Sequence, residues 1–271
     1  MRRDRKLALL EGILRSYGSC LIAFSGGVDS TFLVKVASAV LAPERLLAVT
    51  AASETYPRRE LDFSRKIARK WGIPFQVIRT REFRDARFTA NTPKRCFYCK
   101  DELFLRLQAI AARKGLQTVA DASTVSDLDD YRPGNLVLKA RKVRSPLREA
   151  GLRKEDVRVL SRKMGLETWD KPSLACLASR IPYGTPLTRQ VLKRVNQAEL
   201  ILEGEKLGQV RVRDYGSICR IEVSPRAFGQ LLRRRKRLVP ALRKLGYTYI
   251  TLDLEGYRTG SMNEGLRRKK I

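Results

Sequence analysis

The stretch that decides the fold runs from Cys20 to Leu41 and reads C-L-I-A-F, S-G-G-V-D-S and T-F-L-V-K-V-A-S-A-V-L in its three parts. The first part, residues 20–24, is a compact apolar run that predicts a buried strand. The last part, residues 31–41, predicts a buried helix, and the middle part, residues 25–30, predicts a glycine turn between them. A strand, a glycine turn and a helix in direct succession indicate the start of a parallel α/β sheet.

This turn carries groups that favour an anion. Gly26 and Gly27 allow the backbone to approach a ligand closely, and the amides at the start of the next helix point outward. The hydroxyls of Ser25 and Ser30 add donors. Asp29 repels a bare phosphate, so it indicates a bridging cation, most simply Mg²⁺. The pattern matches neither G-x-x-x-x-G-K-[ST] nor G-x-G-x-x-G, and a purely structural turn is the alternative.

The segments around this stretch continue the alternation of helices and strands. Helices are predicted at 3–18, 57–71 and 99–114, and strands at 46–51, 74–78 and 117–120. The pattern predicts an α/β fold, a Rossmann-like parallel sheet with helices on both faces, in a first domain over residues 1–186.

The character of the chain changes after Pro186. One long helix is predicted at 187–207, strands at 209–213, 218–223 and 247–252, and a helical region that starts at Ser224-Pro225 and breaks near Pro240. The sequence therefore predicts a small α+β domain over residues 187–271.

Composition excludes several kinds of chemistry. The 271 residues include 56 Lys and Arg, 28 Asp and Glu and no His, which gives 56 − 28 = +28. Without histidine there is no imidazole base or ligand. A hydrophobic content of 43% excludes a fully disordered basic chain, and the positive charge predicts attraction to polyanions such as ATP or nucleic acid. The chain has no signal-peptide pattern and no apolar run of about 20 residues, so we expect a cytoplasmic protein without a membrane span.

The five cysteines divide into two groups. Cys96 and Cys99 form a C-x-x-C pair near a predicted helix start, where two thiolates can share a metal and the helix dipole lowers their pKa. Cys176 lies in a run of small residues where a thiol is accessible. Three thiolates leave one iron of a [4Fe–4S] cluster open, and a structural or redox pair is the alternative for the C-x-x-C. Cys20 and Cys219 lie in apolar strands and are expected to be buried.

The motifs resemble those of a known group. The S-G-G-V-D-S turn resembles the pyrophosphate loop of the ATP pyrophosphatase superfamily, whose members cleave ATP to AMP and pyrophosphate and adenylate an acceptor. The resemblance narrows to the LarE family of ATP-dependent sulfur transferases in nickel-pincer nucleotide biosynthesis. It is carried by V-R-S-P-L at 143–147, W-D-K-P-S at 169–173, C-L-A-S-R-I-P-Y-G at 176–184, T-L-D-L-E-G-Y-R at 251–258, and the aspartates around 121–134.

The resemblance implies a reaction. Members of this family activate a carboxylate of pyridinium-3,5-biscarboxylic acid mononucleotide with ATP and convert it to a thiocarboxylate that binds nickel. One branch sacrifices the thiol of a single cysteine and keeps dehydroalanine, and another holds a [4Fe–4S] cluster on three cysteines. Cys96, Cys99 and Cys176 match the second branch, and the Cys176 thiolate is the alternative sulfur nucleophile.

The resemblance also implies site residues. Arg211 and Arg213 share one face of a predicted strand and are expected to bind substrate phosphate, with a solvated strand face as the alternative. Glu199 and Glu222 are weaker candidates for a metal or a subunit contact. The family commonly reads Asp-Gly-Thr-Asn where this chain has D-A-S-T at 121–124, which puts the local nucleotide contacts in question. Cofactors are ATP, Mg²⁺ and the cluster; a sulfur donor and a homo-oligomer are expected. The expected ATP contacts are Ala23, Ser25, Gly26, Gly27, Asp29, Ser30, Ser53, Lys100 and Arg180.

Other functions compete with this one. A tRNA thiolase shares ATP activation, and the five consecutive cations at 233–237 suit a nucleic acid, although a solvated helix face explains them equally. An amidating ligase would not need the three cysteines, and a nucleotide sensor would bind ATP without releasing pyrophosphate.

Overall fold

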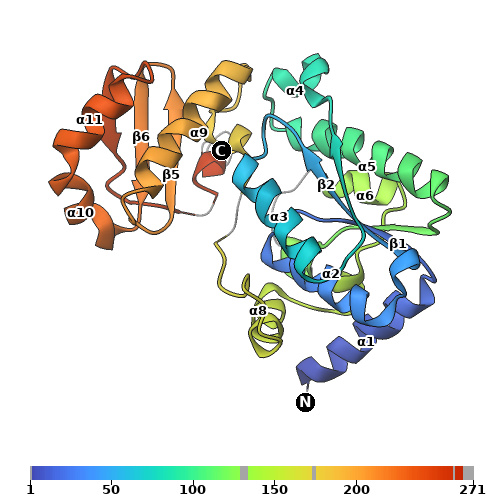
Figure 1. The fold of residues 1–271 in the computed structure, drawn as a ribbon. Helices are drawn as coiled ribbons and strands as arrows, with labels where there is room; N and C mark the ends of the chain where they lie inside the picture. The colour runs from blue at the N-terminus through green and yellow to red at the C-terminus, as the bar shows by residue number, and fades with distance from the viewer. Residues whose placement is uncertain (1, 129–133, 173–174, 259, 265–271) are drawn as a thin grey trace. The chain divides into compact units, whose positions relative to one another are not determined.

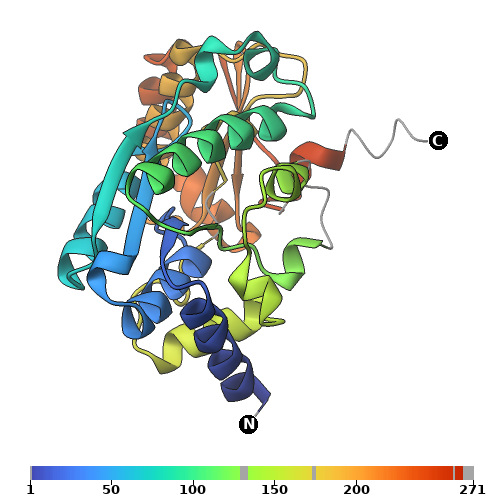
Figure 2. The same cartoon turned by 90° about the vertical axis from the view of Figure 1, so that its right-hand side faces the viewer.

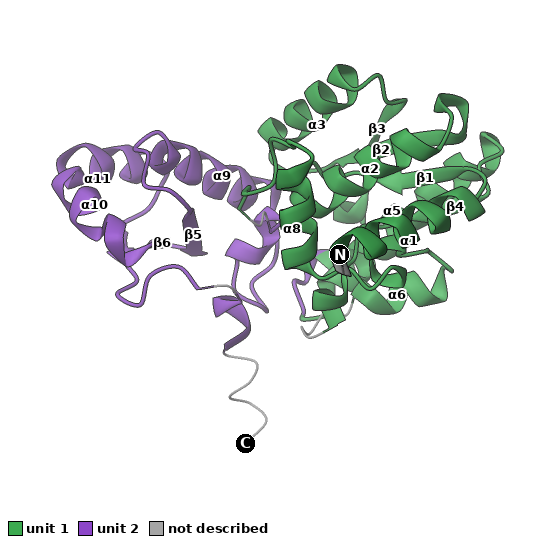
Figure 3. Cartoon of the chain, turned by 90° about the horizontal axis from the view of Figure 1, so that it is seen from below, with its two compact units in different colours: residues 1–88, 93–174 green, residues 89–92, 175–271 purple. Residues whose placement is uncertain are grey.

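The computed structural model describes residues 2–128, 134–172, 175–258 and 260–264 (Figure 1). The chain forms two compact units, coloured separately in Figure 3. Unit 1 comprises residues 1–88 and 93–174, and unit 2 comprises residues 89–92 and 175–271. Within the described ranges, every helix is too short or too polar to cross a bilayer.

Unit 1 is built on a four-stranded parallel sheet of order β3-β2-β1-β4. Its strands are β1 Cys20–Ala23, β2 Leu46–Ala52, β3 Phe75–Arg79 and β4 Thr118–Ala120. The helices up to residue 174 are α1 Arg2–Ser16, α2 Val28–Val40, α3 Arg58–Lys70, α4 Ala86–Thr89, α5 Arg95–Arg113, α6 Gly134–Ala140, α7 Pro146–Glu149 and α8 Lys154–Lys163. The predicted Rossmann-like parallel sheet is confirmed.

Helices cover both faces of this sheet because its strands are apolar on both sides. In β1, Cys20 and Ile22 belong to the buried cluster that contains residues of α1, α2, α3 and α8. Leu21 and the partly buried Ala23 pack with residues of α5 and α6 on the other face. Figure 2 shows the 19-residue helix α5 along its length. The two clusters fix the sheet between two helical layers.

The strand order creates a switch point between β1 and β4. From β1 the chain proceeds to β2 and β3 on one side, and then returns to place β4 on the other side of β1. Connections on either side of such a point diverge, which leaves a crevice at the carboxyl ends of the two strands. The loops after Ala23 and after Ala120 therefore lie at the crevice.

Two helices begin earlier than the sequence predicts. The helix expected from Thr31 begins at Val28, because Gly26, with φ +63°, completes the turn within two residues and Gly27 serves as N-cap. The helix expected from Cys99 begins at Arg95. The first shift places Asp29 in the opening turn of α2, and the second places both residues of the C-x-x-C pair within α5.

Unit 2 is a small α+β unit, as expected. Strand β5 Val210–Tyr215 pairs antiparallel with β6 Ile218–Val223, which pairs parallel with β7 Tyr249–Leu252. Its helices are α9 Arg189–Glu203, α10 Phe228–Arg233 and α11 Arg235–Arg243. The three helices pack on one face of the sheet in a common buried cluster. Helix α9 is shorter than the expected 187–207, since Thr188 caps its start by accepting the Val191 amide at 3.1 Å.

The helical region after β6 is wrongly predicted in one respect. The break expected near Pro240 lies instead at Arg234, whose φ of −92° and ψ of 2° separate α10 from α11. Pro240 lies inside α11. Its ring removes one hydrogen bond, to the carbonyl of Lys236, and both residues are exposed, where water can serve that carbonyl.

The boundary expected at residue 186 falls inside unit 2. Asn91 explains the difference, because its Nδ2 donates to the carbonyls of Pro182 at 2.8 Å and Thr185 at 2.9 Å. The Leu187 amide also donates to the carbonyl of Thr89 at 2.8 Å. Residues 89–92 therefore associate with 175–187, a long-range pairing that composition alone does not reveal.

Candidate active site

A cavity of about 320 Å³ lies in unit 1, at the switch point of the sheet. It is within the size range of small-ligand sites. Residues following β1, β2 and β4 meet in its wall. The lining residues are Ala23, Ser25, Gly27, Val28, Asp29, Ser30, Tyr56, Lys100, Leu103, Phe104, Asp121, Ala122, Ser123, Asp127, Lys154, Arg158 and Pro172. The cavity thus gathers most of the ATP contacts expected in unit 1.

The turn after β1 is held against α3 by a glycine. A Cβ atom on Gly26 would lie 2.5 Å from the Ser64 hydroxyl, and the residue has a positive φ of +63°. Only glycine meets both conditions without strain. The turn is closed from within by Ser30, whose Oγ accepts the Ser25 amide at 3.2 Å and lies 3.1 Å from Ser25 Oγ.

Side chains from outside the turn occupy its carbonyl oxygens. Thr50 donates to the carbonyl of Phe24 at 2.5 Å, and Tyr56 donates to that of Ser25 at 2.6 Å. Lys171 donates to the carbonyl of Gly26 at 3.1 Å. With these carbonyls occupied, the amides at the start of α2, which have no partner within their helix, are the groups the turn can offer to an anion.

Lys171 also joins the turn to α3. Its Nζ lies 2.7 Å from Oε2 of the buried Glu60 and 3.8 Å from the centre of the Phe63 ring. Sequence reasoning placed Lys171 in a family motif without a role. Its position as a brace for the Gly26 carbonyl depends on a contact 145 residues away along the chain.

Asp29 is only partly compensated in the cavity. Its Oδ2 lies 3.7 Å from Nζ of Lys154, and its Oδ1 is buried with no hydrogen-bond partner among the described residues. Burial raises the pKa of this carboxyl above its usual range, and the Lys154 charge opposes that effect. A buried carboxylate oxygen without a donor, beside an anion-binding turn, fits a site for Mg²⁺, which binds through one or two carboxylates and the phosphates of its ligand.

Three cations line the cavity. Lys100 on α5 was expected there, whereas Lys154 and Arg158 on α8 were not. The i, i+4 spacing of the last two residues is the only sequence signal, because it places them on one helix face. The folding of α8 against α2 brings that face to the cavity, and spacing cannot reveal such packing.

Residues of the D-A-S-T segment at 121–124 also lie in the wall. Asp121 Oδ1 accepts the Ser145 hydroxyl at 2.6 Å and the Ser123 amide at 3.2 Å, and its Oδ2 accepts the Ser123 hydroxyl. Thr124 donates its amide to Asp127 at 2.8 Å. These local bonds give the D-A-S-T segment a defined conformation without the glycine and asparagine common in the family.

Three expected ATP contacts are not in the cavity wall: Gly26, which lies in the turn itself, Ser53 and Arg180. Ser53 is absent from the cavity wall; its hydroxyl instead accepts the Thr55 amide at 3.2 Å in the turn after β2. Arg180 belongs to unit 2.

The cysteines follow the expected division where burial is concerned. Cys20 and Cys219 are fully buried, and desolvation raises the pKa of each thiol to about 12. Cys96 and Cys99 are partly buried in the first two turns of α5, and Cys176 is exposed in unit 2. None of the five forms a disulfide. In the part of the chain that the structure describes, no group of three or more Cys, Asp or Glu side chains is arranged to hold a metal ion.

Unit 2 contains a buried set of arginine–glutamate pairs. Arg180, 1% exposed, donates from Nε and Nη2 to both oxygens of Glu199, at 2.8 and 2.9 Å. Glu199 Oε1 also accepts the Val212 amide at 3.1 Å. Each charge is thus paired in the bidentate geometry that offsets the desolvation of two buried ions.

The two arginines of β5 are buried as well. Arg213 donates to both oxygens of Glu222, at 3.0 and 2.7 Å, and to the Ser179 carbonyl at 2.9 Å. Arg211 lies over the Tyr257 ring at 5.5 Å, and burial together with the neighbouring Arg180 charge lowers its pKa. Both arginines are 5% exposed, so the alternative of a solvated strand face is wrong.

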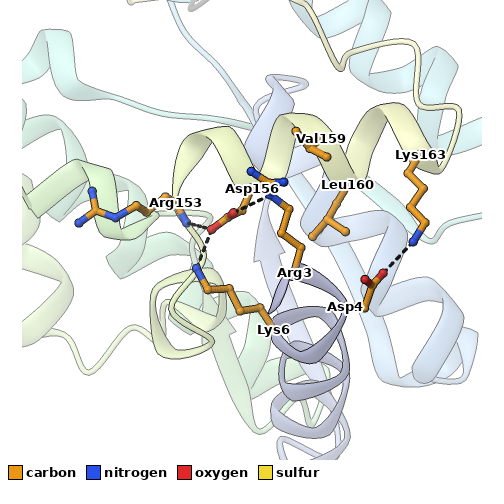
Figure 4. A pocket seen from close by; sticks show the side chains of 8 residues that line it. All are labelled: Arg3, Asp4, Lys6, Arg153, Asp156, Val159, Leu160 and Lys163. Carbon is orange, nitrogen blue, oxygen red and sulfur yellow. Dashed lines mark hydrogen bonds and ion pairs between the residues drawn. The ribbon is translucent and has the colours of Figure 1, made fainter. Parts of the chain in front are cut away.

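Unit 1 has a second cavity, of about 540 Å³, in which the carboxylates are paired with cations. The side chains of Arg3 and Lys6 point toward Asp156, and that of Lys163 points toward Asp4 (Figure 4). Arg3 and Lys6 contact Asp156 at 3.0 and 2.6 Å, and Lys163 contacts Asp4 at 2.7 Å. Because its carboxylates are already paired, this cavity presents no uncompensated acceptor.

Comparison with known proteins assigns the family. No protein-family profile matches the chain. It is 38% identical over 269 residues to the pyridinium-3,5-bisthiocarboxylic acid mononucleotide synthase of Lactiplantibacillus plantarum, with 98% of this chain and 96% of the relative covered. It is 40% identical to an uncharacterised protein of Synechocystis sp. over 98% of this chain and 99% of the relative, and 23% identical to one of Methanocaldococcus jannaschii over 88% and 90%. The chain therefore belongs to the LarE family of pyridinium-3,5-bisthiocarboxylic acid mononucleotide synthases.

Proposed function

We propose that this protein is an ATP-dependent sulfur transferase. It adenylates a carboxylate of pyridinium-3,5-biscarboxylic acid mononucleotide and converts it to the thiocarboxylate of the nickel-pincer nucleotide, releasing AMP and pyrophosphate. The full-length relative named as the synthase of the bisthiocarboxylic acid supports the substrate class. The observation that carries the proposal for this chain is the buried, unpaired Oδ1 of Asp29 beside the turn after β1.

The adenylation step uses the cavity of unit 1. A substrate carboxylate oxygen attacks the α-phosphorus of ATP, and the bond from that phosphorus to the β-phosphate oxygen breaks. The α2 amides and the hydroxyls of Ser25 and Ser30 donate to the departing pyrophosphate. Lys154 and Arg158 add positive charge on the α8 side. Asp29 would hold Mg²⁺, which neutralises part of the charge that develops on the leaving group.

Sulfur transfer is assigned to the exposed cysteine of unit 2. A thiolate at Cys176 attacks the acyl carbon and AMP leaves, which gives a thioester; no imidazole is required because a thiolate is itself the nucleophile. Loss of the Cys176 Cα proton and cleavage of its Cβ–Sγ bond then release the thiocarboxylate and leave dehydroalanine in the chain. A [4Fe–4S] cluster on Cys96, Cys99 and Cys176 stays a prediction from the sequence. The described residues assemble no three-ligand set.

The phosphate of the mononucleotide is assigned to unit 2. Arg180, Arg211 and Arg213 are buried in one group with Glu199 and Glu222. Arginine is the residue suited to phosphate because its planar guanidinium binds phosphate oxygens through two donors. Unit 1 is thus proposed as the adenylation unit, and unit 2 as the unit that binds the substrate phosphate. The protein is proposed to be a cytoplasmic homo-oligomer that takes sulfur from a separate donor.

The test is a split assay of the two half-reactions. The protein is incubated with ATP, Mg²⁺ and the biscarboxylic acid mononucleotide, and pyrophosphate and thiocarboxylate are measured separately. In Cys176→Ala we expect pyrophosphate release to persist and the thiocarboxylate to be lost. The alternative, an amidating ligase, predicts a product without sulfur. It also predicts that Ala variants of Cys96, Cys99 and Cys176 make this product as the wild type does.

Mass and iron analysis separate the two sulfur sources. A chain that loses the elements of H₂S at Cys176 after one turnover indicates the sacrificial route. An anaerobically purified chain with about four irons and with turnover that depends on all three cysteines indicates the cluster.

A tRNA thiolase remains the second candidate, since the cations at 233–237 are exposed. It predicts thiolated nucleosides in tRNA incubated with the protein and ATP, and no thiocarboxylate from the mononucleotide.

A further inference from the structure

The mononucleotide and ATP account for few of the chain's 28 surplus positive charges. One segment of unit 2, residues 223–252, carries eight cations. Residues 223–252 contain no Asp or Glu. The eight cations of this segment are all exposed, and we call them the basic surface: Arg226, Arg233, Arg234, Arg235, Lys236, Arg237, Arg243 and Lys244. They lie on or beside α10 and α11 (Figure 1).

A buried carboxylate orders part of this surface. Arg234 and Arg237 both form ion pairs with Glu205, whose side chain is 4% exposed. The side chain of Arg237 stays 69% exposed. The remaining cations have no carboxylate partner among the described residues. Two of the eight cations are therefore fixed by Glu205, and the others keep an excess of positive charge.

The apolar side chains of the two helices are already used. Leu231, Leu238 and Leu242 are buried in the core of unit 2, and Phe228 packs against it. Leu232 is the exposed exception, at 51%. A helix that binds a bilayer surface needs an apolar face to insert, so a lipid surface does not fit these helices.

We propose that the basic surface binds the phosphate backbone of an RNA. Six of its eight cations are arginines, whose planar guanidinium groups bind phosphate through two donors and stack on unpaired bases. Looped RNA offers both phosphates and unpaired bases, whereas a DNA duplex offers only the phosphates to such a surface. The inference is independent of the sulfur-transfer proposal.

The test is fluorescence anisotropy of a labelled RNA hairpin with the full-length protein at several salt concentrations. If four phosphates are contacted, raising salt from 50 to 200 mM weakens binding about 50-fold. The variant Arg233→Gln/Arg235→Gln/Lys236→Gln leaves the Glu205 pairs intact. We expect it to bind at least about tenfold more weakly and to lower the salt slope by about 2.

The matched control removes three exposed cations of unit 1, in Arg113→Gln/Lys114→Gln/Lys139→Gln. It has the same net charge as the first variant and should bind RNA nearly as the wild type does. Equal weakening in the two variants would show that net charge alone attracts RNA, and would overturn the proposal. So would tighter binding to a DNA duplex, to an acidic protein or to anionic vesicles than to the hairpin. Thiocarboxylate synthesis is measured in parallel and should be unchanged in both variants; its absence from the wild type as well would count against the proposed function and leave the RNA result standing.

Discussion

The cavity of unit 1 and the arginine group of unit 2 treat buried charge in opposite ways. In the cavity, Asp29 keeps a buried oxygen without a donor, and the nearest cation, on Lys154, is 3.7 Å from its other oxygen. In unit 2, Arg180 and Glu199 satisfy each other through two bonds within a fully buried pair. The Asp29 oxygen lacks a partner that a ligand would supply, whereas the Arg180–Glu199 pair is complete without a ligand.

This difference separates two roles of buried charged residues, ligand binding and structural support. A group left unpaired costs folding free energy and is retained where a ligand will complete it. A paired buried ion is costly to disturb and contributes chiefly to the structure around it. We therefore expect substitutions in the cavity to change activity more than stability, and substitutions of the buried pairs to do the reverse.

The largest effect is expected for Arg180→Met. It leaves the Glu199 carboxylate buried without its cation, and breaking such a pair costs about 3–5 kcal/mol of unfolding free energy, measured by urea denaturation. Arg180→Met/Glu199→Leu should recover most of this loss. Arg3→Met, which removes the exposed partner of Asp156, should cost less than about 1 kcal/mol. A loss below 1 kcal/mol in Arg180→Met would mean that the pair is not a structural support.

Asp29→Asn tests the opposite end of the comparison. It keeps the shape of the side chain and removes the charge that would hold Mg²⁺, so we expect pyrophosphate release to fall about 10²–10³-fold. Unfolding free energy should stay constant or rise, because a buried, poorly paired carboxylate is replaced by a neutral amide. A variant that is strongly destabilised yet releases pyrophosphate at the wild-type rate would reverse the roles given to the two regions.

The sequence predicts the sheet better than it predicts either region. Short apolar runs and the glycine turn were sufficient for β1 to β4, because strand and helix periodicity are local properties. The start of α2 was missed by three residues, since one positive-φ glycine completes the turn. Arg158 and Glu199 could not be assigned their contacts from spacing. Both contacts form when distant segments pack, and no local pattern encodes that packing.

Lys171→Met examines the brace behind the phosphate turn. It removes the donor to the Gly26 carbonyl and the 2.7 Å partner of buried Glu60. We expect a loss of about 1–3 kcal/mol in stability and a rise of about tenfold in the KM for ATP, with a smaller change in kcat. Lys70→Met, which breaks an exposed pair with Glu167, is the matched control and should leave both values near wild type. Equal effects in the two variants would remove the special role of Lys171.

The smallest expected effect concerns Cys219, which is buried between the unit 2 sheet and its helices. Its pKa is raised from 9.0 to about 12 by burial, so the folded thiol stays protonated while the unfolded thiol ionises. Stability is then retained below pH 9 and lost as pH rises from 9 toward 12, by about 1.4 kcal/mol at pH 10. In Cys219→Ala the difference in unfolding free energy between pH 8 and pH 10 should shrink by that amount. An unchanged difference in Cys219→Ala would mean that the thiol ionises in the folded core. The interior of unit 2 would then tolerate an unpaired charge, contrary to what its arginine–glutamate pairs indicate.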